Sequence, residues 1–149
     1  MANTFTQIFY HIVFSTKELR PAISEGRRED LLRYVWGIHN NLDCHLYRVN
    51  AVEDHMHILT SIHPDVALSK YINAVKTGSS GWIRKNGIFP NWPGWQVGYG
   101  AFTLSIRDKE AVTEYIKRQQ EHHRQETFVD EYKRLLAEAG IEFDEKYLL

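Results

Sequence analysis

The chain has 149 residues, of which 43% are hydrophobic and 25% are charged. This length suits one compact domain and is too short for two ordinary ones. The composition is not that of a disordered chain, and no apolar run approaches the roughly 18 residues of a membrane span. The chain start lacks the basic and apolar regions of a signal peptide, and the single cysteine, Cys44, excludes an internal disulfide. We expect one cytoplasmic domain over residues 1–149, with no membrane partner.

The net charge of −1 does not favour a strongly basic nucleic-acid-binding surface. A basic face can nevertheless coexist with an acidic one in the same domain. Several lysines and arginines could form such a face while the last third of the chain supplies acidic residues, and five are candidate DNA contacts: Lys76, Arg84, Lys85, Lys117 and Arg118. The charge balance therefore leaves nucleic-acid binding open.

The first half of the chain predicts the order strand, helix, strand, strand. Residues 5–14 are dense in β-branched and aromatic residues and predict a long first strand. A helical pattern capped by Ser24 follows and stops near residue 40. Two further strand-like runs, 44–50 and 55–62, are separated by a short polar corner, so they predict a hairpin.

The middle of the chain predicts a second helix, a loop and a fourth strand. The helix opens at Pro64, but its far end is unclear because residues 77–81 hold two glycines and two serines. Residues 86–100 are rich in proline, tryptophan and glycine, which predicts an irregular loop. Residues 99–106 then predict the last strand.

Two C-terminal helices are predicted, over roughly 108–124 and 128–139, and Thr127 with Asp130 resembles a capping box for the second. The full order is that of an α+β protein, a ferredoxin-like or RRM-like split βαβ sandwich, with its core over roughly 4–106. In this architecture an antiparallel sheet carries helices on one face. The other sheet face is then free for a ligand.

A His-x-His pair lies in the third predicted strand. Alternate side chains of a strand point the same way, so His55 and His57 share one sheet face while Met56 and Ile58 point under the helices. Two neutral imidazoles can bind a divalent ion but cannot complete its coordination. Because the chain has eight histidines, the alternative for this pair is an ordinary surface or core position without metal binding. Asp54 either assists this site or makes the turn.

A tyrosine and a glutamine share one face of the helix predicted over 108–124. Tyr115 and Gln119 are four residues apart, so their side chains are neighbours. A glutamine carbonyl oxygen can bind Mg²⁺ or Mn²⁺, and a phenol one turn away can attack a phosphate held by that ion. A core or boundary role beside Val112 and Ile116 is the alternative for the tyrosine.

Taken together, these motifs resemble those of the single-tyrosine HUH-type insertion-sequence transposases, which include the REP-associated tyrosine transposases. The resemblance covers nearly the whole chain and follows the order and spacing of four segments. They are YHIVFSTK at 10–17, DHMHIL at 54–59, WQVGYG at 95–100 and YIKRQ at 115–119.

The resemblance implies a DNA transposase that cuts and rejoins single-stranded DNA. His55 and His57 would hold a divalent metal, Mg²⁺ or Mn²⁺, and Gln119 would add a ligand. Tyr115 would attack the DNA, leaving a 5′-phosphotyrosine and a free 3′-hydroxyl. The resemblance also implies DNA hairpins as partners, and a homodimer in which the tyrosine helix of one subunit completes the histidine site of the other. The first strand, as a sheet edge, is available for such pairing.

Other functions remain as alternatives. The first is a non-cleaving protein of the same fold that binds single-stranded DNA or RNA hairpins. The second is a metal-dependent phosphohydrolase that uses water and does not need Tyr115. Replication-initiating HUH nucleases fit less well, because their motif arrangement differs and their chains are larger.

Three further groups of residues have two interpretations each. Residues 76–81 resemble a phosphate loop but fail the Walker A order, and they either contact a DNA backbone or form a frayed helix end. His122 and His123 are either extra metal ligands or part of a solvated helix end. Several tryptophans either stack on unpaired bases or serve in packing: Trp82, Trp92 and Trp95.

Overall fold

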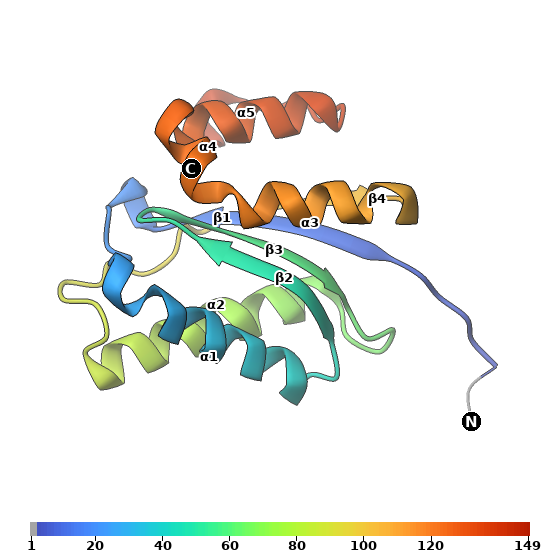
Figure 1. Cartoon of the computed structure of the whole chain (residues 1–149), viewed down its shortest axis with the longest axis horizontal. Coiled ribbons are helices and arrows are strands. Elements are labelled where there is room, and N and C mark those ends of the chain that lie inside the picture. Colours follow the sequence, from blue (N-terminus) through green and yellow to red (C-terminus); the bar gives the residue numbers. More distant parts are fainter. Residues whose placement is uncertain (1–2) are drawn as a thin grey trace.

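The computed structural model describes residues 3–149 and shows a four-stranded antiparallel sheet with helices on both faces (Figure 1). Neighbouring strands pair in the order β2-β3-β1-β4. The strands are β1 (Phe9–Ser15), β2 (His45–Ala51), β3 (His55–Ser61) and β4 (Gly100–Leu104). This topology confirms the predicted α+β split βαβ sandwich.

Five α-helices and four short 3-10 turns complete the described chain. The helices are α1 (Arg28–Asn41), α2 (Leu68–Asn86), α3 (Lys109–Lys117), α4 (Gln119–Gln125) and α5 (Phe128–Glu138). The 3-10 turns are η1 (Lys17–Leu19), η2 (Glu25–Arg27), η3 (Ile106–Asp108) and η4 (Glu145–Tyr147). None of the helices within residues 3–149 is long and apolar enough to cross a membrane.

Helices α1 and α2 cover one face of the sheet and enclose the main core (Figure 1). As the alternation of β3 predicts, Met56 and Ile58 are fully buried on this face. Val35 of α1 and Val75 of α2 belong to the same buried cluster. Burial of these apolar side chains is the main stabilising contribution of this layer.

The opposite face of the sheet is not free, which corrects the expectation of an open ligand face. Helices α3, α4 and α5 lie across it (Figure 1). Ile116 of α3 packs against Leu59 of β3, and Phe128 of α5 belongs to a cluster with Val13 of β1. Apolar side chains therefore emerge on both faces of β1 and β3, and both faces must be covered to keep them from water.

Strand β1 lies in the middle of the sheet, so the expectation that it offers a free edge for pairing is wrong. Its His11 is opposite Leu59 of β3 on one side and Phe102 of β4 on the other. Strand β1 also begins at Phe9, later than predicted. Phe5 and Ile8 precede the paired residues, and their side chains are exposed. The edge strands of this sheet are β2 and β4.

Residues 77–81 lie inside α2, so the interpretation of this segment as a frayed helix end is wrong, while contact with a DNA backbone stays a prediction. The Ser79 hydroxyl donates to the carbonyl of Val75 at 2.6 Å and is fully buried. Gly78 faces α1, where a Cβ atom would lie 3.1 Å from Ile38 Cδ1. These small residues therefore let α1 and α2 pack closely, and the helix continues to Asn86.

The loop between α2 and β4 is irregular, as predicted, and its tryptophans pack inward. The indole N–H of Trp92 donates to Ser80 at 3.0 Å, and that of Trp95 donates to Ser79 at 3.0 Å. Trp82 of α2 stacks on Tyr34 with ring centroids 4.6 Å apart. The packing interpretation is therefore confirmed for Trp92 and Trp95.

The single helix predicted over 108–124 is broken at Arg118 into α3 and α4. The Asn50 side-chain amide donates to the carbonyls of Ile116 at 2.9 Å and Lys117 at 3.2 Å. A continuous helix would bond these carbonyls internally, so this contact from β2 stabilises the break.

Helix α5 begins and ends close to its predicted limits. The Thr127 hydroxyl accepts a hydrogen bond from the Asp130 backbone N–H at 3.2 Å, which confirms the predicted N-cap. At the other end Gly140 has a φ of 71°, a left-handed conformation that suits glycine just past a helix.

Candidate active site

Strand β3 holds His55 and His57 on the sheet face covered by α3, α4 and α5. The two side chains share this face, as predicted, but they are only 1% and 0% exposed. Neither histidine is therefore a surface residue. Their Nε2 atoms point to a common set of oxygen atoms from the C-terminal helices.

Gln119, the predicted third metal ligand, reaches this cluster from α4. Its side-chain oxygen lies 3.1 Å from His55 Nε2, and its amide nitrogen donates to Glu131 at 3.1 Å. The side chain is fully buried. Although the helix is broken between Tyr115 and Gln119, both side chains still point to the same place.

Glu131 of α5 is a site residue that sequence reasoning missed. Its Oε1 atom lies 3.2 Å from His55 Nε2 and 3.1 Å from His57 Nε2. The three residues form a fully buried group whose ligand atoms lie within 4.8 Å of one another. The sequence contained a signal, because Glu131 interrupts the apolar face that Phe128 and Leu135 mark on this helix.

Tyr115 of α3 lies beside the histidines of its own chain. Its hydroxyl donates to Glu131 Oε2 and accepts from the Arg134 guanidinium at 2.8 Å. Its ring centroid is 5.8 Å from that of His57. Burial and the Glu131 hydrogen bond raise the pKa of Tyr115, and Arg134 acts in the opposite direction. Arg134, also missed from the sequence, is thus a cation at the candidate nucleophile.

His11 of β1 supports His57 from behind. Its Nε2 atom lies 2.8 Å from His57 Nδ1, and both rings are buried. A histidine that binds a metal through one ring nitrogen is commonly oriented by a partner on the other. His11 is suited to that role, although the sequence had shown it only as part of a family motif.

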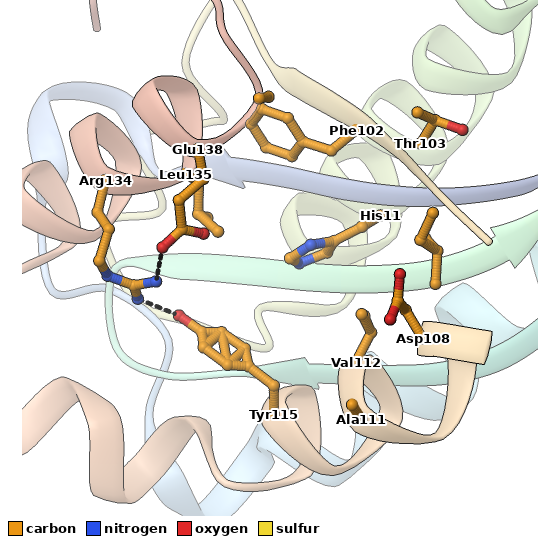
Figure 2. A pocket seen from close by; sticks show the side chains of 12 residues that line it. His11, Phe102, Thr103, Asp108, Ala111, Val112, Tyr115, Arg134, Leu135 and Glu138 are labelled. Carbon is orange, nitrogen blue, oxygen red and sulfur yellow. Dashed lines mark hydrogen bonds and ion pairs between the residues drawn. The ribbon is translucent and has the colours of Figure 1, made fainter. Parts of the chain in front are cut away.

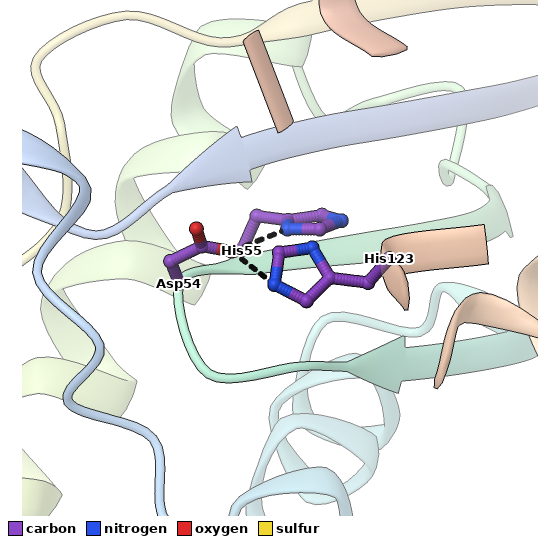
Figure 3. Close-up of side chains that lie close together, drawn as sticks. All are labelled: Asp54, His55 and His123. Atoms are coloured by element: carbon purple, nitrogen blue, oxygen red, sulfur yellow. Dashed lines mark hydrogen bonds and ion pairs between the residues drawn. The ribbon is translucent and has the colours of Figure 1, made fainter. Parts of the chain in front are cut away.

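Asp54 contacts the far nitrogen of His55, while His123 of α4 approaches from the side (Figure 3). Asp54 Oδ1 lies 2.7 Å from His55 Nδ1 and 3.9 Å from His123 Nε2. His123 Nε2 is 3.1 Å from Glu53. Asp54 therefore orients His55, whereas His123 meets acidic side chains at a partly buried position.

The carboxylates determine the charge state of this buried cluster. Burial disfavours a charged His55, but hydrogen bonds with Asp54 and Glu131 outweigh it and raise the pKa of His55 to about 9. Burial and the neighbouring His57 lower the pKa of His11 to about 3. Burial likewise lowers the pKa of His57. Burial alone would raise the pKa of Glu131, but hydrogen bonds from His55 and His57 lower it.

The donor atoms of the cluster fit a divalent ion. Two imidazole nitrogens, one carboxylate oxygen and one amide oxygen are suitable ligands for Mg²⁺ or Mn²⁺. The closest of these atoms are 3.1 to 3.2 Å apart. The ligand atoms of His55, His57 and Glu131 all lie within 4.8 Å of one another, so they would be able to share one ion. The group comprises His55, His57, Gln119 and Glu131.

A cavity of about 490 Å³ opens beside Tyr115, between β4, α3 and α5 (Figure 2). Tyr115, Arg134 and His11 line it, whereas the four candidate metal ligands do not. Tyr115 is the half-buried member of the site, so this cavity is where its side chain meets solvent.

The cations considered as DNA contacts lie in two helical layers. They are Lys76, Arg84 and Lys85 on α2, and Lys117 and Arg118 at the α3–α4 junction. The Lys76 ammonium donates to the carbonyls of Gln96 at 2.8 Å and Gly98 at 2.6 Å, so it ties α2 to the following loop. These residues do not form one continuous basic face, and their role in DNA binding stays a proposal.

The split βαβ sheet brings together a His-x-His pair, two side-chain oxygen atoms that can bind a metal, and a tyrosine hydroxyl. Such a site is suited to phosphoryl transfer by a tyrosine. Residues 4–119 match the family described as "Transposase IS200 like". Because the match spans well over half of the chain, this protein belongs to the IS200-like transposase family. It is thus a DNA-cleaving enzyme of that general kind. The match ends before α5, which supplies Glu131.

Two solved structures share the fold. One is a candidate transposase from Deinococcus radiodurans R1, with a TM-score of 0.62, 19% identity, and coverage of 80% of this chain and 96% of that chain. The other is a REP-associated tyrosine transposase bound to a REP hairpin, with a TM-score of 0.61, 12% identity, and coverage of 83% and 74%. A comparison with curated proteins finds no match.

Proposed function

We propose that this transposase cuts and rejoins single-stranded DNA through a 5′-phosphotyrosine, with Tyr115 as the nucleophile. The observation that carries the proposal is the convergence on Glu131. Its carboxylate accepts the Tyr115 hydroxyl through one oxygen and contacts His55 and His57 through the other. A tyrosine that served only in packing would not need such partners.

A divalent ion, Mg²⁺ or Mn²⁺, fits the group formed by His55, His57, Gln119 and Glu131. When bound, it polarises the scissile phosphate and offsets the charge that builds on its oxygens. Asp54 and His11 hold the far nitrogens of the two histidines and so fix the direction of their Nε2 atoms.

In the cutting step the Tyr115 oxygen forms a bond to phosphorus, and the bond between phosphorus and the 3′ oxygen breaks. Glu131 Oε2 accepts a hydrogen bond from the Tyr115 phenol and orients it, and solvent takes the phenol proton. The departing 3′ oxygen is protonated by solvent to give the 3′-hydroxyl. Arg134 donates to the phenol oxygen and stabilises its anion. The phosphotyrosine formed in this step is itself a phosphodiester. A different 3′-hydroxyl can therefore attack it, release Tyr115 and join new ends.

DNA must reach a site that is closed in this structure. The four candidate metal ligands are at most 2% exposed, and α5 carries one of them over the sheet. Because a scissile phosphate has to meet both the ligands and Tyr115, we propose that α5 shifts when DNA binds. The cavity beside Tyr115 is the point of entry.

The test of the main proposal is a cleavage assay with single-stranded DNA that carries a hairpin, in Mg²⁺, Mn²⁺ or chelator. We expect a metal-dependent covalent protein–DNA adduct that Tyr115→Phe abolishes, because phenylalanine keeps the ring and removes the attacking oxygen. Nicking that persists without an adduct in Tyr115→Phe would identify a hydrolase. Hairpin binding without any cutting would identify the non-cleaving module.

We also propose, from the family resemblance, that the protein acts as a homodimer that exchanges the tyrosine helix. In this structure Tyr115 lies beside His57 of the same chain, so exchange requires α3 to move into the partner. Mixing inactive Tyr115→Phe subunits with inactive His57→Ala subunits tests this. Recovered cleavage supports exchange, since one mixed site then has both residues. No recovery means that each chain cuts with its own tyrosine.

A further inference from the structure

The cavity beside Tyr115 has the walls of a small-ligand site. Its volume of about 490 Å³ falls within the range of roughly 300–1,000 Å³ that is usual for such sites. Apolar side chains from three elements form most of its surface: Phe102 and Leu104 of β4, Ala111 and Val112 of α3, and Leu135 of α5. The Phe102, His11 and Tyr115 rings all line it (Figure 2).

The position of the cavity relates it to the scissile phosphate. Tyr115 forms part of its wall, and Arg134, which donates to the Tyr115 hydroxyl, stands at the same end (Figure 2). A phosphate attacked by Tyr115 therefore lies at the mouth of the cavity. The adjoining nucleoside is covalently attached to that phosphate, so it is within reach of the apolar walls.

The charged side chains around the cavity would orient a bound nucleotide. Figure 2 shows Arg134 and Asp108 on opposite sides. The Arg134 side chain is 39% exposed and pairs with Glu126 at 2.9 Å and with Glu138 at 3.3 Å, so it attracts a phosphate by exchanging one of these carboxylates for it. The exposed Asp108 carboxylate repels a phosphate. Within residues 3–149, Asp108 accepts a side-chain hydrogen bond from Ser105 through Oδ2, and Oδ1 is free to accept another. An amino group of a base suits that oxygen.

We propose that this cavity binds the unpaired base next to the scissile phosphate, and that it favours adenine or cytosine over thymine. The proposal rests on the proposed cleavage of single-stranded DNA. The base stacks on the aromatic and apolar walls, as bases do in single-strand-binding sites. Its exocyclic amino group donates to Asp108. Thymine presents carbonyl oxygens on either side of its ring N–H, and these face the carboxylate unfavourably.

The test measures binding of short single strands of about 12 nucleotides by fluorescence anisotropy, in chelator so that no cutting occurs. The probes are oligo-dA, oligo-dC, oligo-dT and an abasic strand. We expect oligo-dA and oligo-dC to bind about tenfold more tightly than oligo-dT or the abasic strand.

Two variants probe the cavity, each with a matched control. Ala111→Trp fills the cavity from an exposed helical position and is expected to reduce the base preference to less than about twofold. Ala137→Trp, at an exposed alanine of α5 outside the cavity, leaves it unchanged. Asp108→Asn adds a donor and is expected to bring oligo-dT close to oligo-dC. Glu110→Gln removes the same charge from a neighbouring exposed position of α3 and has no such effect.

The outcomes separate this inference from the proposed function. Equal binding of all four strands, or a preference that survives Ala111→Trp, overturns the base site while leaving DNA cleavage by Tyr115 intact. A protein that binds none of the strands and no hairpin overturns both. The base site is supported if Ala111→Trp and Asp108→Asn lose the preference for oligo-dA and oligo-dC while Ala137→Trp and Glu110→Gln keep it.

Discussion

At the scale of single residues, Glu131 connects the two halves of the candidate active site. One of its oxygens contacts the histidines and the other contacts the tyrosine hydroxyl. Removing its charge should therefore affect both metal affinity and the nucleophile. The neighbouring Asp130 is exposed on the same helix, so it offers a matched comparison.

Glu131→Gln is expected to weaken Mn²⁺ binding by about tenfold or more, because an anionic ligand becomes a neutral amide. Isothermal titration calorimetry measures the affinity directly. Asp130→Asn, which removes a charge from the helix surface, should bind Mn²⁺ like the unmodified protein. If both variants bind equally well, Glu131 is not a ligand and serves only to hold Tyr115.

His11 is expected to orient His57 for metal binding. A metal at His57 Nε2 leaves the proton on Nδ1, which then donates to His11 Nε2 across the observed 2.8 Å. His11→Phe removes this acceptor and should lower Mn²⁺ affinity by about 10- to 100-fold. His11→Gln offers a carbonyl oxygen in its place and should recover part of the loss. A His11→Phe variant with full affinity would exclude the role.

At the scale of elements, α5 works as a cover that also supplies site residues. Phe128 at its start is 1% exposed, and its ring centroid lies 4.6 Å from that of His55. Arg134 in its middle pairs with Glu126 at 2.9 Å. Phe128, Tyr132 and Leu136 pack against Val13 and Phe102 in a cluster separate from the α1–α2 core, so the proposed movement of α5 would leave that core undisturbed.

Phe128→Ala should loosen α5 selectively. The loss of a large buried ring is expected to speed hydrogen exchange of α5 amides by roughly tenfold or more relative to amides of β1 and β3. Mass spectrometry of exchanged peptides compares the two regions. An equal increase in α5 and in the sheet would show that α5 opens only when the whole domain unfolds, and would contradict its role as a separate cover.

At the scale of the whole molecule, a buried histidine outside the active site makes stability depend on pH. His39 lies on the opposite side of the sheet from the active site, in α1, and is fully buried. It contacts the Val35 carbonyl at 2.8 Å and the Tyr71 hydroxyl at 2.6 Å. Burial lowers the pKa of His39 below its ordinary value, which the Val35 hydrogen bond only partly offsets.

The unfolded chain therefore binds a proton at His39 more readily than the folded chain does. The stability that depends on neutral His39 is complete above about pH 6.5 and falls as the pH drops below it, by at most about 1.4 kcal/mol per pH unit. Urea unfolding at several pH values measures this slope. His39→Gln should be less stable at pH 7 but should show a shallower slope between pH 6.5 and 5. Parallel curves for the two proteins would mean that His39 does not titrate.

The sequence by itself determined the order of strands and helices along the chain, the shared face of His55 and His57, and the pairing of Tyr115 with Gln119. These follow from local periodicity, which depends on strand and helix geometry. The capping of α5 was likewise readable, because Thr127 and Asp130 are close along the chain.

Only the tertiary structure decided which distant residues complete the site. Glu131 meets His57 across 74 positions, and His11 meets it across 46, separations that no periodicity encodes. The break between α3 and α4 depends on Asn50 from another strand. The burial of the histidines has the same origin, since only packing of α3, α4 and α5 onto apolar residues of the second sheet face shows that this face is covered.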